Sequence, residues 1–87
     1  MNYACPCCGS KTLPAPPPGT FHTCEVCGWE DDFVQFDDPD FRGGANEPSL
    51  REAQQNYSLL GTYDPGYVKV RPPSEEEMPD PDWTPLT

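Results

Sequence analysis

Apolar residues recur at helical spacing in the stretch between Ser49 and Gly61. One face of this stretch carries Leu50, Ala53, Tyr57 and Leu60. Ser49 and Glu52 form the S-x-x-E pattern of a capping box at its start, and Gly61 can close its end. Asn46 offers an alternative start for the helix. Because a helix of this length is marginal in isolation, we expect its apolar face to pack against the rest of the chain.

Short extended runs predict a β-hairpin nearer the N-terminus. Residues 11–13 and 20–23 flank a loop of prolines and glycine at residues 14–19, so we expect these two runs to pair with each other. Residues 68–70 can form a last strand.

Residues 29–36 mix bulky aromatic side chains with acids. We expect Trp29, Phe33 and Phe36 to form an apolar surface that receives the helix, with the carboxylates facing water. The alternative is a second site for a hard metal ion or for catalysis, built from Glu30, Asp31, Asp32, Asp37, Asp38 and Asp40. The spacing of these acids matches no EF-hand loop, and residues 37–44 are rich in turn formers.

Composition limits the size of the core. The chain has 87 residues, of which 34% are hydrophobic, and nine of its 13 prolines cluster at residues 14–18 and 72–85. We therefore expect one small domain at residues 1–71 and an acidic, proline-rich tail at residues 72–87. The tail either stays extended or lies on the domain, with Trp83 as its anchor.

Cysteines supply the chemistry that a small core lacks. Two C-x-x-C pairs, Cys5 with Cys8 and Cys24 with Cys27, are each followed by glycine and are separated by fifteen residues. This is the spacing of paired zinc knuckles, whose four thiolates converge on one tetrahedral ion. A structural zinc contributes about 10–16 kcal/mol in small peptides, against about 5–15 kcal/mol for the whole stability of an ordinary domain. We therefore expect metal to decide whether the N-terminal half folds.

The position of the two glycines sets the register of the site and leaves Cys7 outside it as a free thiol. Two disulfides or a redox-active C-x-x-C are the rival interpretations. An odd number of cysteines and a start without a basic or apolar leader pattern disfavour disulfides and favour a cytoplasmic location. A redox-active C-x-x-C would open a helix after a strand, whereas Pro6 and Gly9-Ser10-Lys11 indicate a knuckle that runs into a hairpin. His22, close to Cys24, is a further candidate ligand.

Charge bears on the class of partner. Fifteen acidic residues against five basic ones give a net charge of −10. Phosphate contacts need clustered Lys and Arg, so nucleic acid is disfavoured as a partner, and so is an anionic membrane surface. A basic protein, such as a nuclease toxin, fits this charge better.

Several motifs occur together in one order along the chain. They are Cys5-Pro6-Cys7-Cys8-Gly9, the second cysteine pair, Trp29-Glu30-Asp31-Asp32, Gly43-Gly44-Ala45-Asn46, Ser49-Leu50 with Glu52-Ala53, Asn56-Tyr57, and Arg71-Pro72-Pro73. Their combination resembles the bacterial cysteine-rich CPCC family over roughly residues 3–77. The resemblance implies that the cysteines bind zinc and that ribbon and helix form one unit; it implies no reaction and no substrate.

These patterns predict a small, metal-stabilised α+β fold. It has zinc-ribbon or rubredoxin-like knuckles with a short β-hairpin, one amphipathic helix packed on it, and an extended proline-rich C-terminal tail. The predicted function is that of a non-enzymatic, acidic interaction protein with Zn²⁺ held by Cys5, Cys8, Cys24 and Cys27. The alternatives are rubredoxin-like iron for electron transfer and an enzyme that uses the thiol of Cys7.

Overall fold

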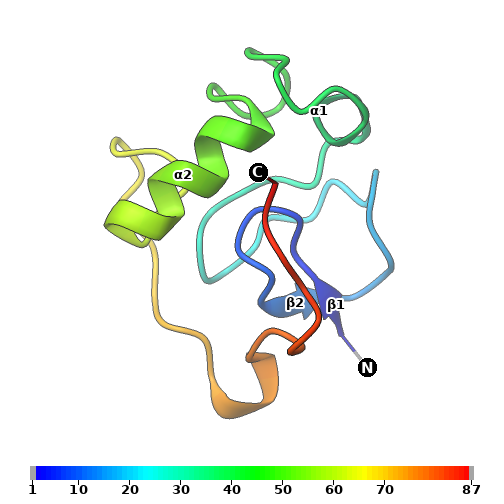
Figure 1. Cartoon of the computed structure of the whole chain (residues 1–87), viewed down its shortest axis with the longest axis vertical. Helices are drawn as coiled ribbons and strands as arrows, with labels where there is room; N and C mark the ends of the chain where they lie inside the picture. The colour runs from blue at the N-terminus through cyan, green and yellow to red at the C-terminus, as the bar shows by residue number, and fades with distance from the viewer. Residues whose placement is uncertain (1, 87) are drawn as a thin grey trace.

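The computed structural model describes residues 2–86 (Figure 1). Its elements, in chain order, are β1 (Tyr3–Ala4), β2 (Lys11–Leu13), α1 (Phe33–Asp37), α2 (Leu50–Leu60) and the 3-10 helix η1 (Glu75–Glu77). Figure 1 shows α2 on one side of the hairpin formed by β1 and β2, with the C-terminal segment running back across the body from η1. None of the helices in residues 2–86 combines the length and apolarity needed to cross a lipid bilayer.

The hairpin forms around the first cysteine turn rather than between the two turns. β1 pairs antiparallel with β2, with Tyr3 opposite Leu13 and Ala4 opposite Lys11. The expected pairing of residues 11–13 with residues 20–23 is therefore wrong. Residues 20–23 instead lead into the second turn, where Thr23 forms a bridge with Glu30 across it. Each cysteine turn is thus closed by its own two flanks.

The main helix agrees with its sequence pattern. The Ser49 hydroxyl accepts a hydrogen bond from the Glu52 N–H at 3.1 Å, and the Glu52 carboxylate accepts one from the Ser49 N–H at 3.0 Å, which confirms the capping box. Gly61 ends α2 in the left-handed conformation, with φ 77°. Leu50 and Ala53 are buried, but Leu60 is 58% exposed. The expected apolar face therefore stops before the last turn.

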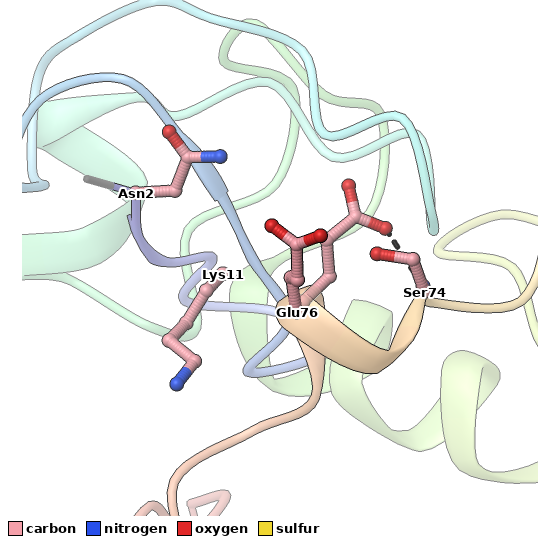
Figure 2. A pocket seen from close by; sticks show the side chains of 5 residues that line it. Asn2, Lys11, Ser74 and Glu76 are labelled. Carbon is pink, nitrogen blue, oxygen red and sulfur yellow. Dashed lines mark hydrogen bonds between the residues drawn. The ribbon is translucent and has the colours of Figure 1, made fainter.

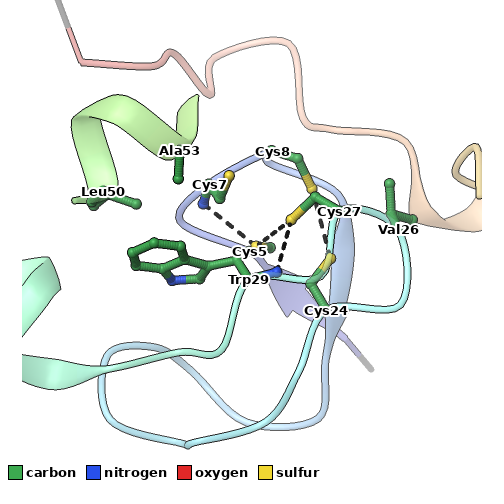
Figure 3. Packing of buried hydrophobic residues seen from close by; sticks show 9 residues of the cluster. All are labelled: Cys5, Cys7, Cys8, Cys24, Val26, Cys27, Trp29, Leu50 and Ala53. Atoms are coloured by element: carbon green, nitrogen blue, oxygen red, sulfur yellow. Dashed lines mark hydrogen bonds between the residues drawn. The ribbon is translucent and has the colours of Figure 1, made fainter. Parts of the chain in front are cut away.

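Five of the nine buried residues in the core that joins the turns to α2 are cysteines (Figure 3). The cluster consists of all five cysteines together with Val26, Trp29, Leu50 and Ala53. Trp29 is 1% exposed and lies between the cysteine turns and α2, as expected. Phe33 and Phe36 do not join it, since they are 56% and 43% exposed.

Polar side chains replace these two aromatic rings inside the molecule. Asp32 caps α1 by accepting hydrogen bonds from the N–H groups of Val34 and Gln35, and this start turns Gln35 inward while Phe33 and Phe36 face out. The Asp32 carboxylate also accepts from the Ala45 N–H at 2.8 Å. The expectation that the carboxylates face water is wrong here, because Asp31 is fully buried and Asp32 is 8% exposed.

Gln35 organises the chain between α1 and α2. Its amide nitrogen lies within 3.1 Å of the carbonyl oxygens of Phe41, Asn46 and Pro48, and its amide oxygen accepts from both the main chain and the side chain of Asn46. The Asn46 side chain in turn pairs with both main-chain groups of Glu30. Asn46 therefore links segments and does not cap the helix.

The chain beyond α2 lies on this body without forming a further strand in the described residues. Residues 68–70, expected as a strand, have no regular secondary structure. Next to them, the Arg71 N–H donates to the Val26 carbonyl at 3.3 Å. The tail returns to the first cysteine turn, where Trp83 is half-buried.

Candidate metal centre

Four sulfur atoms meet at one point in the core. The Sγ atoms of Cys5, Cys8, Cys24 and Cys27 all lie within 4.8 Å of one another, and all four residues are buried. The distances from Cys5 to Cys27 and from Cys8 to Cys24 are both 3.7 Å. Four sulfurs bound at about 2.3 Å around a tetrahedral ion lie about 3.8 Å apart. The side chains are therefore arranged to bind a metal ion, and none of the five cysteines is in a disulfide.

Two turns of the same design aim these sulfurs. We call residues 5–9 the first knuckle and residues 24–28 the second knuckle. In each, the N–H of the glycine donates to the carbonyl of the first cysteine at 2.8 Å, and the N–H of that cysteine donates to the carbonyl five residues later. Gly9 and Gly28 have φ values of 80° and 93°, a backbone region that residues other than glycine rarely adopt. The two glycines therefore occupy equivalent positions in the two knuckles, as their spacing predicts.

An aromatic ring covers the glycine of each knuckle. A Cβ atom at Gly9 would lie 2.6 Å from the indole ring of Trp83, and one at Gly28 would lie 2.4 Å from the ring of Tyr67 and 2.9 Å from that of Tyr63. Two separate features therefore require glycine at these positions: the positive φ value and the close approach of an aromatic ring.

Each of the four sulfurs accepts a hydrogen bond from a protein donor. Main-chain N–H groups donate to three of them at 3.4 Å: Cys7 to Cys5, Ser10 to Cys8 and Trp29 to Cys27. The fourth donor is the hydroxyl of Thr12 in β2, 3.0 Å from the sulfur of Cys24. Such donors stabilise the negative charge of thiolates, which is the form that binds metal.

The comparison with known families agrees with this geometry. The chain matches the family described as Cysteine-rich CPCC over residues 3–77. It belongs to that family. No curated protein matches the sequence. The match ends at η1, so Trp83, which contacts the first knuckle, lies outside the region of this CPCC chain that matches the family.

Without a cation, the four thiols of the CPCC centre share their protons unevenly. Hydrogen bonds from Cys27 and Cys5 lower the pKa of the Cys24 thiol, while the contact with Cys24 raises the pKa of the Cys27 thiol. Burial raises the pKa of the Cys5 thiol. One thiolate therefore suppresses ionisation of its neighbours, and a bound divalent cation would relieve that suppression.

Cys7, the third cysteine of the CPCC motif, lies beside the centre and not in it. Its sulfur is not in the four-sulfur group, and Figure 3 shows it on the side that faces Ala53 of α2. It is nevertheless only 2% exposed. A nucleophile must reach its substrate, so this burial disfavours a thiol-dependent reaction at Cys7.

The other candidate ligands do not assemble. Within residues 2–86, the four-cysteine group is the only set of three or more His, Cys, Asp or Glu side chains placed to hold a metal ion. The acidic cluster at residues 30–40 is divided between structural roles and exposed positions. Asp31 accepts hydrogen bonds from the N–H and hydroxyl of Thr20, and His22 is exposed.

Proposed function

We propose that this CPCC protein binds one Zn²⁺ through Cys5, Cys8, Cys24 and Cys27, and that the zinc is structural. The observation that carries the proposal is the 3.7 Å spacing of buried sulfurs in two equivalent knuckles. Bound zinc would supply cross-linking of the two knuckles, because a shell of four thiolates leaves no open position for water or substrate.

The composition of the core supports a structural role for the metal. Five of the nine residues in the buried hydrophobic cluster are cysteines, and only four are other apolar residues. Four thiols held this close repel one another once ionised, so the metal-free core is unfavourable at the pH where the thiols begin to ionise. A reducing compartment such as the cytoplasm would keep these thiols available for metal.

Metal content of substituted proteins tests the ligand set. We expect purified wild-type protein to hold one zinc per chain by elemental analysis, and Cys8→Ser or Cys24→Ser to lose it. Cys7→Ser is the matched control, because it removes a buried sulfur from the same knuckle and should keep the metal. Equal loss of zinc from Cys7→Ser and Cys8→Ser would contradict the assignment.

Iron is the second candidate for the same four sulfurs. Four cysteine thiolates also suit a rubredoxin-like iron, and hydrogen bonds to sulfur, as seen here at all four positions, tune the potential of such centres. A red colour with visible absorption bands in freshly purified protein would favour iron and electron transfer. A colourless protein that contains zinc would favour the structural role.

We further propose that the protein acts by binding a basic protein, for example a toxin, and not by catalysis. Four of the five basic side chains, Lys11, Arg42, Arg51 and Arg71, already form ion pairs with carboxylates of the same chain. These basic groups are therefore engaged within the chain, and the net charge of −10 favours attraction to an external cationic surface. Phe21 and Phe33 are 62% and 56% exposed and could anchor such a partner.

Affinity capture from the native cell at increasing salt tests this second proposal. Retention of a basic protein at low salt, with release as ionic strength rises, is the expected result. Binding that is insensitive to salt, or recovery of nucleic acid in place of protein, would contradict it.

A further inference from the structure

The segment 80–86, which we call the strap, lies across the first knuckle. Its Trp83 ring rests directly on Gly9, so closely that a Cβ atom there would lie 2.6 Å from two indole carbons. Figure 1 shows the C-terminal segment passing over the hairpin on its way back toward α2. The strap therefore covers the turn that carries Cys7 and Cys8.

Polar contacts hold the strap near both of its ends. Asp80 forms an ion pair with Lys11 of β2 at 3.0 Å. At the other end, the Leu86 N–H donates to the Gln54 side chain of α2 at 2.8 Å, and the same side chain donates to the Pro6 carbonyl of the first knuckle at 2.8 Å. Gln54 thus joins helix, knuckle and strap.

A polar cleft of about 450 Å³ lies between η1 and the hairpin, just before the strap in sequence (Figure 2). It is lined by Asn2, Lys11, Ser74, Glu76 and Glu77. Arg71 forms an ion pair with Glu77 of η1 at 2.7 Å and another with Glu25 of the second knuckle at 3.4 Å, and its N–H donates to the Val26 carbonyl. Contacts that do not involve the strap therefore link η1 to the second knuckle through Arg71.

Beneath the strap is the least protected part of the metal centre. A cleft of about 230 Å³ is lined by Cys7 and Cys8 from the knuckle, Tyr57 from α2, and Trp83 and Pro85 from the strap. Cys8 is 5% exposed, whereas the other three candidate ligands are fully buried. A reagent that reaches the centre from this cleft would meet Cys7 and Cys8 first.

The two knuckles differ in how firmly they are covered. Tyr63 and Tyr67 cover the second knuckle from the loop that directly follows α2, and the Tyr63 N–H donates to the Cys27 carbonyl at 3.0 Å. Trp83 covers the first knuckle from a segment beyond the family match, whose residues are otherwise largely exposed. Segments with few buried contacts open at low free-energy cost without global unfolding.

We propose that the strap gates the metal centre. Closed, it shields Cys7 and Cys8; when Trp83 lifts from Gly9, chelators and thiol reagents enter through the cleft while α2, the second knuckle and η1 stay in place. The part of this inference that concerns metal release rests on the proposed zinc site, whereas the shielding of Cys7 does not.

The test uses the full zinc-loaded chain and the variant Trp83→Ala. Two rates are measured: alkylation of each cysteine by iodoacetamide, followed by peptide mass spectrometry, and transfer of zinc to 4-(2-pyridylazo)resorcinol. We expect Cys7 to react at least about tenfold faster than in wild type, the change that corresponds to about 1.4 kcal/mol in the closing equilibrium, and zinc transfer to accelerate with it. Trp83→Phe, which keeps a ring over Gly9, should lie between the two, and Leu59→Ala, at a site that is 81% exposed, should match wild type.

Asp80→Asn is a second variant that should favour the open strap while it leaves Trp83 intact. It should accelerate alkylation of Cys7 and Cys8 by a smaller factor than Trp83→Ala. Unchanged rates in both variants would overturn the proposal. Equal acceleration at Cys7, Cys24 and Cys27 would also overturn it, since that result indicates global loosening. If the wild-type protein contains no metal, the zinc site fails, yet selective acceleration at Cys7 and Cys8 in the metal-free chain would still support the strap.

Discussion

The hydroxyl of Thr12 is the donor to the metal centre that can be removed by a side-chain substitution alone. It lies 3.0 Å from the Cys24 sulfur, whereas the other three sulfurs accept from main-chain N–H groups. Thr12→Val replaces the hydroxyl by a methyl group of similar size and keeps the β-branched shape that suits strand β2. The substitution therefore removes one hydrogen bond with little change in packing.

The size of the effect follows from the charge of the acceptor. A hydrogen bond to a charged group contributes about 1.5–3 kcal/mol. Thr12 is only partly buried, so water can replace part of the lost bond and the lower end of this range applies. A loss of about 1.5 kcal/mol raises the dissociation constant for zinc about tenfold.

Competition with a chelator of known zinc affinity at fixed pH measures this change. Thr12→Ser is the matched control, because it keeps the hydroxyl and should stay within about threefold of wild type. Stability of the metal-free proteins, measured in parallel, shows whether any change is confined to the metal-bound state. Equal zinc affinity of Thr12→Val and wild type, or an equally weakened Thr12→Ser, would refute the assignment of Thr12 as a stabiliser of the Cys24 thiolate.

Three further predictions concern the scaffold. Gln35→Leu should lower the free energy of unfolding by at least about 3 kcal/mol, because it leaves several buried main-chain groups unpaired; urea denaturation measures this, and exposed Gln55→Leu should change it by less than about 0.5 kcal/mol. Ser49→Ala should cost about 1 kcal/mol by removing the cap of α2, while Ser58→Ala, on the exposed side, should not; equal losses in thermal unfolding would argue against the cap. Burial, and then the nearby sulfurs, raise the pKa of Tyr57 to about 12, so its contribution to stability is present below the unfolded pKa of about 10 and is lost as pH rises through about 12. Tyr57→Phe should therefore lose less stability than wild type across this range, and identical curves would contradict the cause.

The parts of the structure that depend on near neighbours in sequence are the parts that the sequence predicts. The capping box of α2 and its terminal glycine act within one turn of helix, so Ser49 and Gly61 mark its ends reliably. The register of the metal centre is equally local, because Gly9 and Gly28 stand at the same offset from their cysteines. The four sulfurs consequently meet as their spacing predicts.

Contacts between distant segments account for the errors. The sequence of α1 places Phe33 and Phe36 one turn apart, a spacing that favours an apolar core face. Asn46, however, offers Gln35 both a main-chain and a side-chain partner, and this network draws the polar side chain inward in place of the rings. No local pattern reveals that pairing.

The prediction of the strand pairing was wrong for a related reason. Residues 11–13 and 20–23 are both extended, and their pattern does not state whether each turn closes on itself or on the other. For the same reason, the role of Thr12 is not predicted from the sequence. It follows only from the pairing of β2 with β1, which places the Thr12 hydroxyl beside the Cys24 sulfur of the second knuckle. A hydroxyl residue four positions after a candidate ligand cysteine was the available sign.

The order of the metal centre along the chain has a consequence for synthesis. All four sulfurs lie between Cys5 and Cys27, and every one of them leaves the ribosome before α2 does. A nascent chain can therefore capture its ion while Trp29 is still uncovered, and the arrival of Leu50 and Ala53 then completes the burial of that ring. The metal centre can therefore be assembled while the chain is still being made, before the helix that covers it exists.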